Sequence, residues 1–264
     1  MSASLPSHTF TQPSRMLTYK EIHGRKLTLH IFVPEVETSA PRPCILLIHS
    51  GGWVQNSPEK YYFLARPLSE MGFVVACLEY RLYDEKARPP VSVIDAVADT
   101  QDAQRYLHAN AKELNIDPHR IVACGGSAGA HLAAGLALFD NLVPERPIIA
   151  PEALVLLNPV IDTSAEGFGQ DKLKENWEAY SPLHRLRPGI PPTLIFHGTG
   201  DRTTPYAGAA AFARKATANG DTCVLITHEG GDHGYYREEP IFTETLEAIQ
   251  SFLQEHRLLG QKGS

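Results

Sequence analysis

The clearest chemical signal in this chain is the pentapeptide GGSAG at 125–129, which contains G-x-S-x-G with Ser127 at its centre. A nucleophilic serine needs a tight strand-to-helix turn with a positive φ, and flanking glycines leave room for the strand and the helix to pass each other. The apolar run Ile121–Cys124 before the motif and a helical pattern after it provide that context. A glycine-rich turn without catalysis has a similar pattern, so Ser127 needs partners elsewhere in the chain.

An acid and a base follow Ser127 in the chain order of a serine hydrolase. Asp201 ends the motif HGTGD, directly after the apolar run Thr193–Phe196. His233 lies in GGDHG, after the apolar run Cys223–Thr227. We expect both loops to emerge at the same sheet edge as Ser127. His233 would then take the serine proton and return it to the leaving alcohol, while the aspartate fixes the tautomer of the histidine.

The sequence leaves competitors for two of these roles. His228 is the second candidate base, although it lies close to the strand end and lacks flanking glycines. Asp162 follows the preceding strand and is the second candidate acid. Asp232 is expected to form a turn, because adjacent side chains usually diverge. Two other histidines at strand-to-loop junctions are expected to make structural hydrogen bonds, namely His49 and His197.

A second glycine pair predicts the oxyanion hole. Gly51 and Gly52 lie in HSGGW, directly after the apolar run Cys44–Ile48, which is the place of the oxyanion loop in such hydrolases. Adjacent glycines let backbone N–H groups turn toward a substrate carbonyl. Together with the N–H of Ala128 at a helix N-terminus they would hold the oxyanion, at about 3 kcal/mol per donor. The alternative is an ordinary Gly-Gly turn.

The elements that must position these loops follow an α/β pattern. Apolar, β-branched runs alternate with helical patterns, which predicts a mostly parallel sheet with helices on both faces. The eight expected strands begin with an antiparallel pair and are Met16–Tyr19, Lys26–Phe32, Cys44–His49, Phe73–Leu78, Ile121–Cys124, Leu154–Leu157, Thr193–His197 and Cys223–Thr227. The expected helices are Tyr61–Met71, Val91–Asn110, Ala128–Phe139, Tyr206–Asn219 and Ile241–His256.

The polar segment 162–191 interrupts this alternation. An insertion at this point of a doubly wound sheet lies over the carboxyl ends of the strands, so we interpret it as a short lid. The length of the chain suits one α/β domain covering residues 1–264. Aromatic side chains in the loops above the nucleophile are candidates to bind substrate, with anchoring of their own loops as the alternative. They are Trp53, Trp177, Tyr180, Tyr206 and Tyr235.

Composition and charge restrict the class of partner. The net charge of −6 is spread without basic clusters, which argues against nucleic acid, and no apolar run reaches the roughly 20 residues that span a bilayer. Residues 1–15 show no signal-peptide pattern, which favours the cytoplasm unless the start is a processed one. The 12 histidines and four cysteines form no metal motif, so we expect no metal or cofactor and buried free thiols. The expected partner is a small molecule, and the oligomeric state stays open.

Taken together, seven motifs resemble the esterase/lipase branch of the α/β-hydrolase superfamily, and most closely the bacterial feruloyl/acetylxylan-esterase-like carboxylesterases. The motifs are HSGGW, EYRL at 79–82, GGSAGAHLA at 125–133, NPVID at 158–162, SPL at 181–183, HGTGD and GDHGYY. The resemblance covers residues 16–259 and implies the α/β-hydrolase fold with the same triad and oxyanion donors. Hormone-sensitive-lipase-like relatives usually carry Asp before the nucleophile and three glycines after the oxyanion histidine. Gly126 and Ser50 depart from that pattern and favour the smaller, nearly lidless esterases.

The expected activity is that of a serine carboxylesterase. A short lid does not cover a long acyl chain, so small or short-acyl esters are the expected substrates, including acetyl or feruloyl esters of carbohydrates. An amide hydrolase such as an arylformamidase or a peptidase would use the same triad and is the first alternative. A hydrolase-fold binding protein without activity is the alternative of another class, and the three intact triad motifs argue against it.

Overall fold

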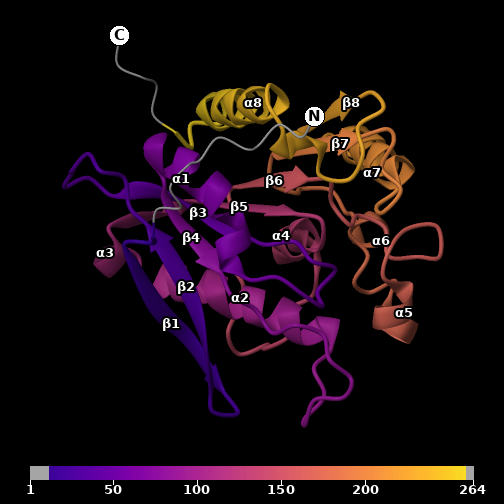
Figure 1. Ribbon diagram of the computed structural model, residues 1–264, viewed down its shortest axis with the longest axis horizontal. Coiled ribbons are helices and arrows are strands. Elements are labelled where there is room, and N and C mark those ends of the chain that lie inside the picture. Colours follow the sequence, from indigo (N-terminus) through magenta and orange to yellow (C-terminus); the bar gives the residue numbers. More distant parts are fainter. Residues whose placement is uncertain (1–11, 260–264) are drawn as a thin grey trace, which may run out of the picture.

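The computed structural model describes residues 12–259, and its centre is one eight-stranded sheet (Figure 1). The strands are β1 (Arg15–Ile22), β2 (Arg25–Phe32), β3 (Arg42–Ile48), β4 (Val74–Leu78), β5 (Ile116–Gly126), β6 (Ala153–Leu157), β7 (Thr193–Gly198) and β8 (Cys223–His228). Their order across the sheet is β1-β2-β4-β3-β5-β6-β7-β8. β2 pairs antiparallel with β1 and β4, and all remaining pairs are parallel. The predicted mostly parallel eight-stranded sheet is confirmed.

Helices cover both faces of the sheet (Figure 1). α1 (Tyr62–Glu70) and α8 (Ile241–Glu255) contribute to the core on one face. The core on the other face includes α2 (Val93–Ala109), α4 (Ala128–Leu138) and α7 (Tyr206–Ala218). The short helical turns are η1 (Pro58–Tyr61), α3 (Ala111–Leu114), α5 (Gln170–Leu173), η2 (Lys174–Asn176), α6 (Pro182–Arg185) and η3 (Tyr235–Arg237).

Strand β3 shows why the central strands are continuous apolar runs. Successive side chains of a strand point to opposite faces of the sheet. Leu46 and Ile48 belong to the core that contains α2 and α4, whereas Ile45 and Leu47 belong to the core that contains α1 and α8. Both faces are therefore buried from Cys44 to Ile48, and none of these positions accommodates a charged side chain without cost.

The main differences from the sequence-based expectation lie in β5 and in the 162–191 segment. β5 begins at Ile116, five residues before the expected start, and its first residue pairs with Arg42 across a register shift. The start of the strand was not predicted because this stretch contains Asp117-Pro118, a pair that is typical of a turn. The 162–191 segment also contains the short helices α5 and α6, which were not expected. All four cysteines are free, and three of them are fully buried.

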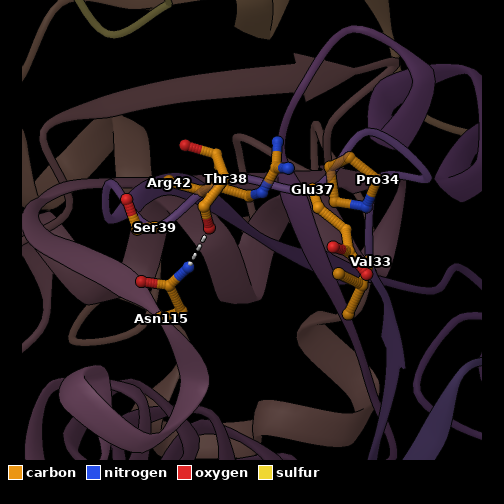
Figure 2. A pocket seen from close by; sticks show the side chains of 7 residues that line it. All are labelled: Val33, Pro34, Glu37, Thr38, Ser39, Arg42 and Asn115. Carbon is orange, nitrogen blue, oxygen red and sulfur yellow. Dashed lines mark hydrogen bonds between the residues drawn. The ribbon is translucent and has the colours of Figure 1, made fainter.

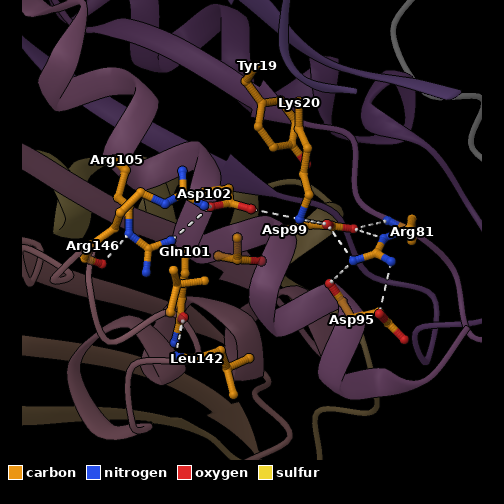
Figure 3. A network of polar contacts seen from close by, with 12 residues as sticks. Tyr19, Lys20, Arg81, Asp95, Asp99, Gln101, Asp102, Arg105, Leu142 and Arg146 are labelled. Carbon is orange, nitrogen blue, oxygen red and sulfur yellow. Dashed lines mark hydrogen bonds and ion pairs between the residues drawn. The ribbon is translucent and has the colours of Figure 1, made fainter. Parts of the chain in front are cut away.

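A polar network joins Lys20 of β1 to Asp99 and Asp102 of α2 (Figure 3). The carboxylate of Asp99 has no exposed surface and lies 2.7 Å from Lys20 Nζ and 2.8 Å from Arg81 Nε. Arg81 comes from the EYRL motif that follows β4, so this pairing fixes the chain after the strand to the helix. No helix within residues 12–259 combines the length and the apolar character that crossing a membrane requires.

Candidate active site

The turn between β5 and α4 holds Ser127 in a strained backbone conformation with positive φ, at φ +54° and ψ −119°. A Cβ at Gly125 would lie 2.5 Å from the backbone carbonyl of Gly129. A Cβ at Gly129 would lie 2.2 Å from the carbonyl oxygen of Ile48 in the neighbouring strand β3. Only glycine fits at these two positions, and the strained turn that they allow presents Ser127 at the carboxyl end of the sheet.

Ser127, His233 and Asp201 form one chain of hydrogen bonds. The Oγ of Ser127 lies 3.1 Å from Nε2 of His233, and Nδ1 of His233 lies 2.8 Å from Oδ2 of Asp201. The three residues come from the loops after β5, β8 and β7, and all of these loops leave the same edge of the sheet. Distances of this size permit proton transfer from the serine to an oriented imidazole.

Asp201 is surrounded by hydrogen-bond donors. Its Oδ1 accepts the N–H groups of Thr203 at 2.8 Å and Thr204 at 2.9 Å, and its Oδ2 accepts the Thr204 hydroxyl at 2.9 Å. His197 Nε2 lies 3.3 Å from the same Oδ2. Burial alone would raise the pKa of Asp201, but hydrogen bonds from His197, His233 and the Thr204 N–H outweigh it and hold the pKa well below its usual range. Asp201 is therefore ionised at neutral pH.

Asn158 is a residue of this site to which the sequence assigned no role. Its side-chain Nδ2 lies 3.1 Å from both ring nitrogens of His233, and the residue is 2% exposed. Its backbone has φ +36°, and its carbonyl accepts the Thr204 hydroxyl at 3.3 Å. An Asn-Pro pair directly after the buried strand β6 was the available signal, because a polar residue there lies at the ligand-binding edge of the sheet.

The predicted oxyanion loop lies against the turn that carries Ser127. A Cβ at Gly129 would meet the His49 carbonyl at 2.6 Å, so this loop and the start of α4 are in direct backbone contact. Gly51 and Gly52 have φ values of +127° and +58°. A Cβ at Gly51 would lie 2.1 Å from the Gln55 carbonyl, so this tight turn requires glycine. The N–H of Ala128, at the first position of α4, has no acceptor within the helix.

The competing base and acid are engaged elsewhere. The His228 ring stacks on Tyr235, with centroids 4.6 Å apart and an interplanar angle of 9°. Asp162 accepts the Ser164 N–H at 2.8 Å and lies 3.8 Å from His184. Within the described range 12–259, neither residue hydrogen-bonds to the serine and histidine of the triad. The carbonyl of Asp232 accepts the Tyr235 N–H at 3.3 Å, as in a turn.

Of the five aromatic residues expected to bind substrate, Trp53 is the most deeply buried. It has no exposed surface, and its ring packs 5.0 Å edge-on from His131 and 5.7 Å from Phe168. Its φ is +64°, so it has a positive φ like the two glycines that precede it, and its ring is packed inside the protein. Trp53 therefore anchors the predicted oxyanion loop to α4, and a substrate-binding role for it stays a prediction.

The other four aromatic residues are partly buried and contact their own surroundings. Tyr180 packs edge-on against Phe139, and Trp177 packs edge-on against His184. Tyr206 shares a hydrogen bond of 2.8 Å with the Thr227 hydroxyl. Tyr235 stacks on His228, and its hydroxyl has no partner among the described residues. A substrate-binding role for these four residues stays a prediction.

The 162–191 segment reaches the oxyanion loop. Phe168 lies 3.5 Å from the position of a Cβ at Gly52, and a Cβ at Gly169 would meet the Trp53 ring at 2.5 Å. Closure of this segment over a substrate stays a prediction. Within residues 12–259, no three His, Cys, Asp or Glu side chains gather in a way that could hold a metal ion.

An open cavity of about 490 Å³ lies at the other end of the sheet (Figure 2). It is lined by Val33, Pro34, Glu37, Thr38, Ser39, Arg42 and Asn115. Arg42 begins β3 and Asn115 directly precedes β5, so the cavity faces the amino ends of the parallel strands. Ligands of α/β sheets bind at the carboxyl ends, where Ser127 lies.

Two family models match the chain, BD-FAE over residues 29–153 and TAP-like protein over residues 175–258. The structure of Thermogutta terrifontis esterase 2 phosphoramylated by tabun matches with a TM-score of 0.86 and 34% sequence identity, over 94% of this chain and 96% of that chain. The chain belongs to the esterases of the α/β-hydrolase superfamily. The BD-FAE match agrees with the feruloyl-esterase-like resemblance of the sequence motifs.

Two curated relatives of this α/β-hydrolase esterase are also ester hydrolases by name. Ethyl acetate hydrolase of Pseudomonas putida is 28% identical over 262 residues, which is 88% of this chain and 80% of that protein. A probable isoprenylcysteine alpha-carbonyl methylesterase of Arabidopsis thaliana is 26% identical over 238 residues, which is 78% of this chain and 48% of that protein. The chain thus spans about half the length of this plant relative.

Proposed function

We propose that this esterase is a serine carboxylesterase that hydrolyses short-acyl esters through an acyl-enzyme at Ser127. The observation that carries the proposal is the continuous hydrogen-bond chain from the Ser127 hydroxyl through His233 to the buried Asp201 carboxylate, at 3.1 and 2.8 Å. The strained turn that holds the serine is a further sign of function, because such a conformation persists only where the surrounding structure enforces it.

In the proposed reaction, the Ser127 Oγ attacks the ester carbonyl while its proton moves to Nε2 of His233. Asp201 stabilises the resulting imidazolium, and the N–H groups of Gly51, Gly52 and Ala128 would hold the oxyanion. The tetrahedral intermediate then expels the alcohol, which takes the proton from His233. Water activated by the same histidine releases the carboxylic acid and restores the serine.

The preference for short acyl groups draws support from two relatives. Structures of Thermogutta terrifontis esterase 2 have propionate or butyrate bound, at 33% and 32% identity to this chain. The Pseudomonas putida relative is named for the hydrolysis of ethyl acetate. In this chain Phe168 lies over Gly52, which limits the room beside the proposed oxyanion donors.

A panel of p-nitrophenyl esters from acetate to decanoate tests the proposal. We expect kcat/KM to be highest for acetate to butyrate and to fall for octanoate and decanoate. Ser127→Ala should lower kcat by about 10⁶-fold and abolish labelling by a fluorophosphonate probe. Faster turnover of the long-chain esters would contradict the acyl preference. Hydrolysis or labelling that persists in Ser127→Ala would contradict the mechanism.

A further inference from the structure

The residue before the nucleophile has no side chain, and two tyrosine hydroxyls occupy the adjoining space. A Cβ at Gly126 would lie 1.9 Å from the hydroxyl of Tyr61 and 2.8 Å from the hydroxyl of Tyr236. The two phenols are at most 1% exposed, and their oxygens are 3.1 Å apart in a hydrogen bond. They come from η1 and η3, 175 positions apart in the chain, and together they support the backbone next to Ser127.

A guanidinium group completes this cluster. The Cζ of Arg237 lies 5.8 Å from the ring centroid of Tyr61 and 5.7 Å from those of Phe63 and Tyr236. Such distances place the cation within the range of attraction to aromatic rings. No carboxylate of residues 12–259 forms an ion pair with Arg237. Its orientation is therefore set by aromatic rings and hydroxyl groups.

Arg237 also contacts the oxyanion loop. Its Nη2 donates a hydrogen bond of 3.4 Å to the Oγ of Ser50, the residue directly before Gly51. The carbonyl of the same serine accepts the Asn56 side-chain amide at 3.1 Å and lies 2.8 Å from Nδ1 of His49. Ser50 is thus held at both its side chain and its carbonyl.

The oxyanion loop needs such external support because its backbone is unusual. Three consecutive residues, from Gly51 to Trp53, have positive φ values of +127°, +58° and +64°. Glycine adopts a positive φ at little cost, but Trp53 does so only at a cost in free energy and where neighbouring groups enforce it. The loop after the base His233 supplies one of those groups, because Arg237 lies four residues beyond that histidine.

We propose that Arg237 is a positioning residue that fixes Ser50 on the tyrosine pair and thereby aims the N–H groups of Gly51 and Gly52 at the developing oxyanion. This inference rests on the proposed function. Arg237 acts through Ser50 and does not itself touch the reacting atoms. The cluster links the nucleophile turn, the base loop and the oxyanion loop, so that a shift in one is transmitted to the others.

The test compares Arg237→Gln, Arg237→Lys, Ser50→Ala and the double variant Ser50→Ala/Arg237→Gln on p-nitrophenyl acetate. Arg237→Gln should lower kcat by about 10- to 100-fold, because misplacement by about 1 Å can cost ~10²-fold, while KM changes by less than about threefold. It should weaken inhibition by a short-chain trifluoromethyl ketone, whose serine adduct carries an oxyanion, by the same factor. Arg237→Lys should restore part of both.

The double variant shows whether the effect of Arg237 on kcat is transmitted through Ser50. If the arginine acts through the serine, the double variant should be no slower than Arg237→Gln alone. Arg214→Gln, which removes the same charge from the exposed surface of α7, should stay within about twofold of wild type. Wild-type kcat and inhibition in Arg237→Gln, or strictly additive losses in the double variant, would overturn the proposal.

A folding check on Arg237→Gln and a parallel measurement of Ser127→Ala complete the test. If Arg237→Gln does not fold by circular dichroism, Ser50→Ala decides alone, since its loss of kcat and of ketone affinity supports the proposal and wild-type values overturn it. Ser127→Ala, measured in parallel, separates the two levels of inference. Activity retained in Ser127→Ala refutes the proposed function, whereas an inactive Ser127→Ala beside a fully active Arg237→Gln refutes only the positioning role.

Discussion

Two aspartates with fully buried side chains, Asp99 and Asp201, lie in very different surroundings. Asp99 accepts two hydrogen bonds from the Arg81 side chain at 2.8 and 2.9 Å, and Lys20 adds a third cationic contact at 2.7 Å (Figure 3). Asp201 has no lysine or arginine partner among the described residues. Its partners are N–H and O–H groups of Thr203 and Thr204, and histidine rings.

The difference separates a structural carboxylate from one suited to catalysis. Asp99 is paired with permanent cations, and these ion pairs hold β1 and the chain after β4 onto α2. Asp201 is held ionised by dipoles, and its negative charge is left uncompensated until His233 becomes protonated. An imidazolium formed beside it gains the full benefit of that charge in a site of low dielectric constant.

Of the substitutions that test this difference between the two aspartates, replacement of Asp201 should have the largest effect, and the effect is on kcat. Asp201→Asn should lower kcat by about 10⁴-fold, because an amide does not fix the required tautomer of His233 and carries no charge to stabilise its protonated form. Steady-state kinetics on p-nitrophenyl acetate measure it. Asp162→Asn is the matched control, and we expect it to stay within about threefold of wild type. The reverse pattern would assign the acid to Asp162.

At Asp99 the expected effect is on stability instead. Asp99→Asn leaves Arg81 and Lys20 without their buried partner and should lower the free energy of unfolding by about 3–5 kcal/mol. The folded variant should keep kcat within about threefold of wild type, because the network does not contact the triad. Urea unfolding and kinetics at 25 °C measure both. A loss of activity without a loss of stability would contradict the assignment.

Lowering the pH should destabilise the fold through two buried histidines, His49 beside the predicted oxyanion loop and His131 on α4. Burial lowers the pKa of His49 and of His131 to about 4, below the ordinary value of 6.5. Between these values the unfolded chain binds protons that the folded chain does not, so stability falls as the pH drops from about 6.5 toward 4. From pH 7 to pH 5 each histidine should cost about 2 kcal/mol.

Urea unfolding at pH 7, 6 and 5 measures this slope. His131→Gln should reduce the loss between pH 7 and pH 5, because a glutamine offers a donor for the Tyr180 carbonyl, which His131 contacts at 2.7 Å, and does not titrate. Equal slopes in His131→Gln and wild type would show that burial does not keep this ring neutral.

Much of the fold and three loops of the site could be predicted because their signals are local. The pentapeptide around Ser127 is dictated by sterics, since a side chain at Gly129 would collide with β3 at 2.2 Å. Asp201 and His233 each follow an apolar strand, and parallel strands end at one edge. The inward turn of Trp53 was not predictable, because it depends on the φ values of the oxyanion loop.

The contacts that escaped prediction join residues distant in sequence. Tyr61 and Tyr236 form a hydrogen bond although they are 175 positions apart in the chain. No sequence motif indicates that these two residues pair. Asn158 meets His233 across 75 positions, and only its place after a buried strand hinted at a role. Pairings of this kind depend on how loops pack once the sheet has formed, and periodicity carries no information about them.

The smallest expected effect on stability concerns Arg146, at the solvent-exposed edge of the network that contains Asp99 (Figure 3). Arg146 lies 3.1 Å from Asp102, but its side chain is 60% exposed, whereas the Asp99 side chain has no exposed surface. Solvent screens the exposed pair, so Arg146→Gln should lower the free energy of unfolding by no more than about 0.5 kcal/mol and leave kcat unchanged. Urea unfolding beside Asp99→Asn measures the contrast. If the two variants were equally destabilised, burial would not be what gives the Asp99 pairing its strength.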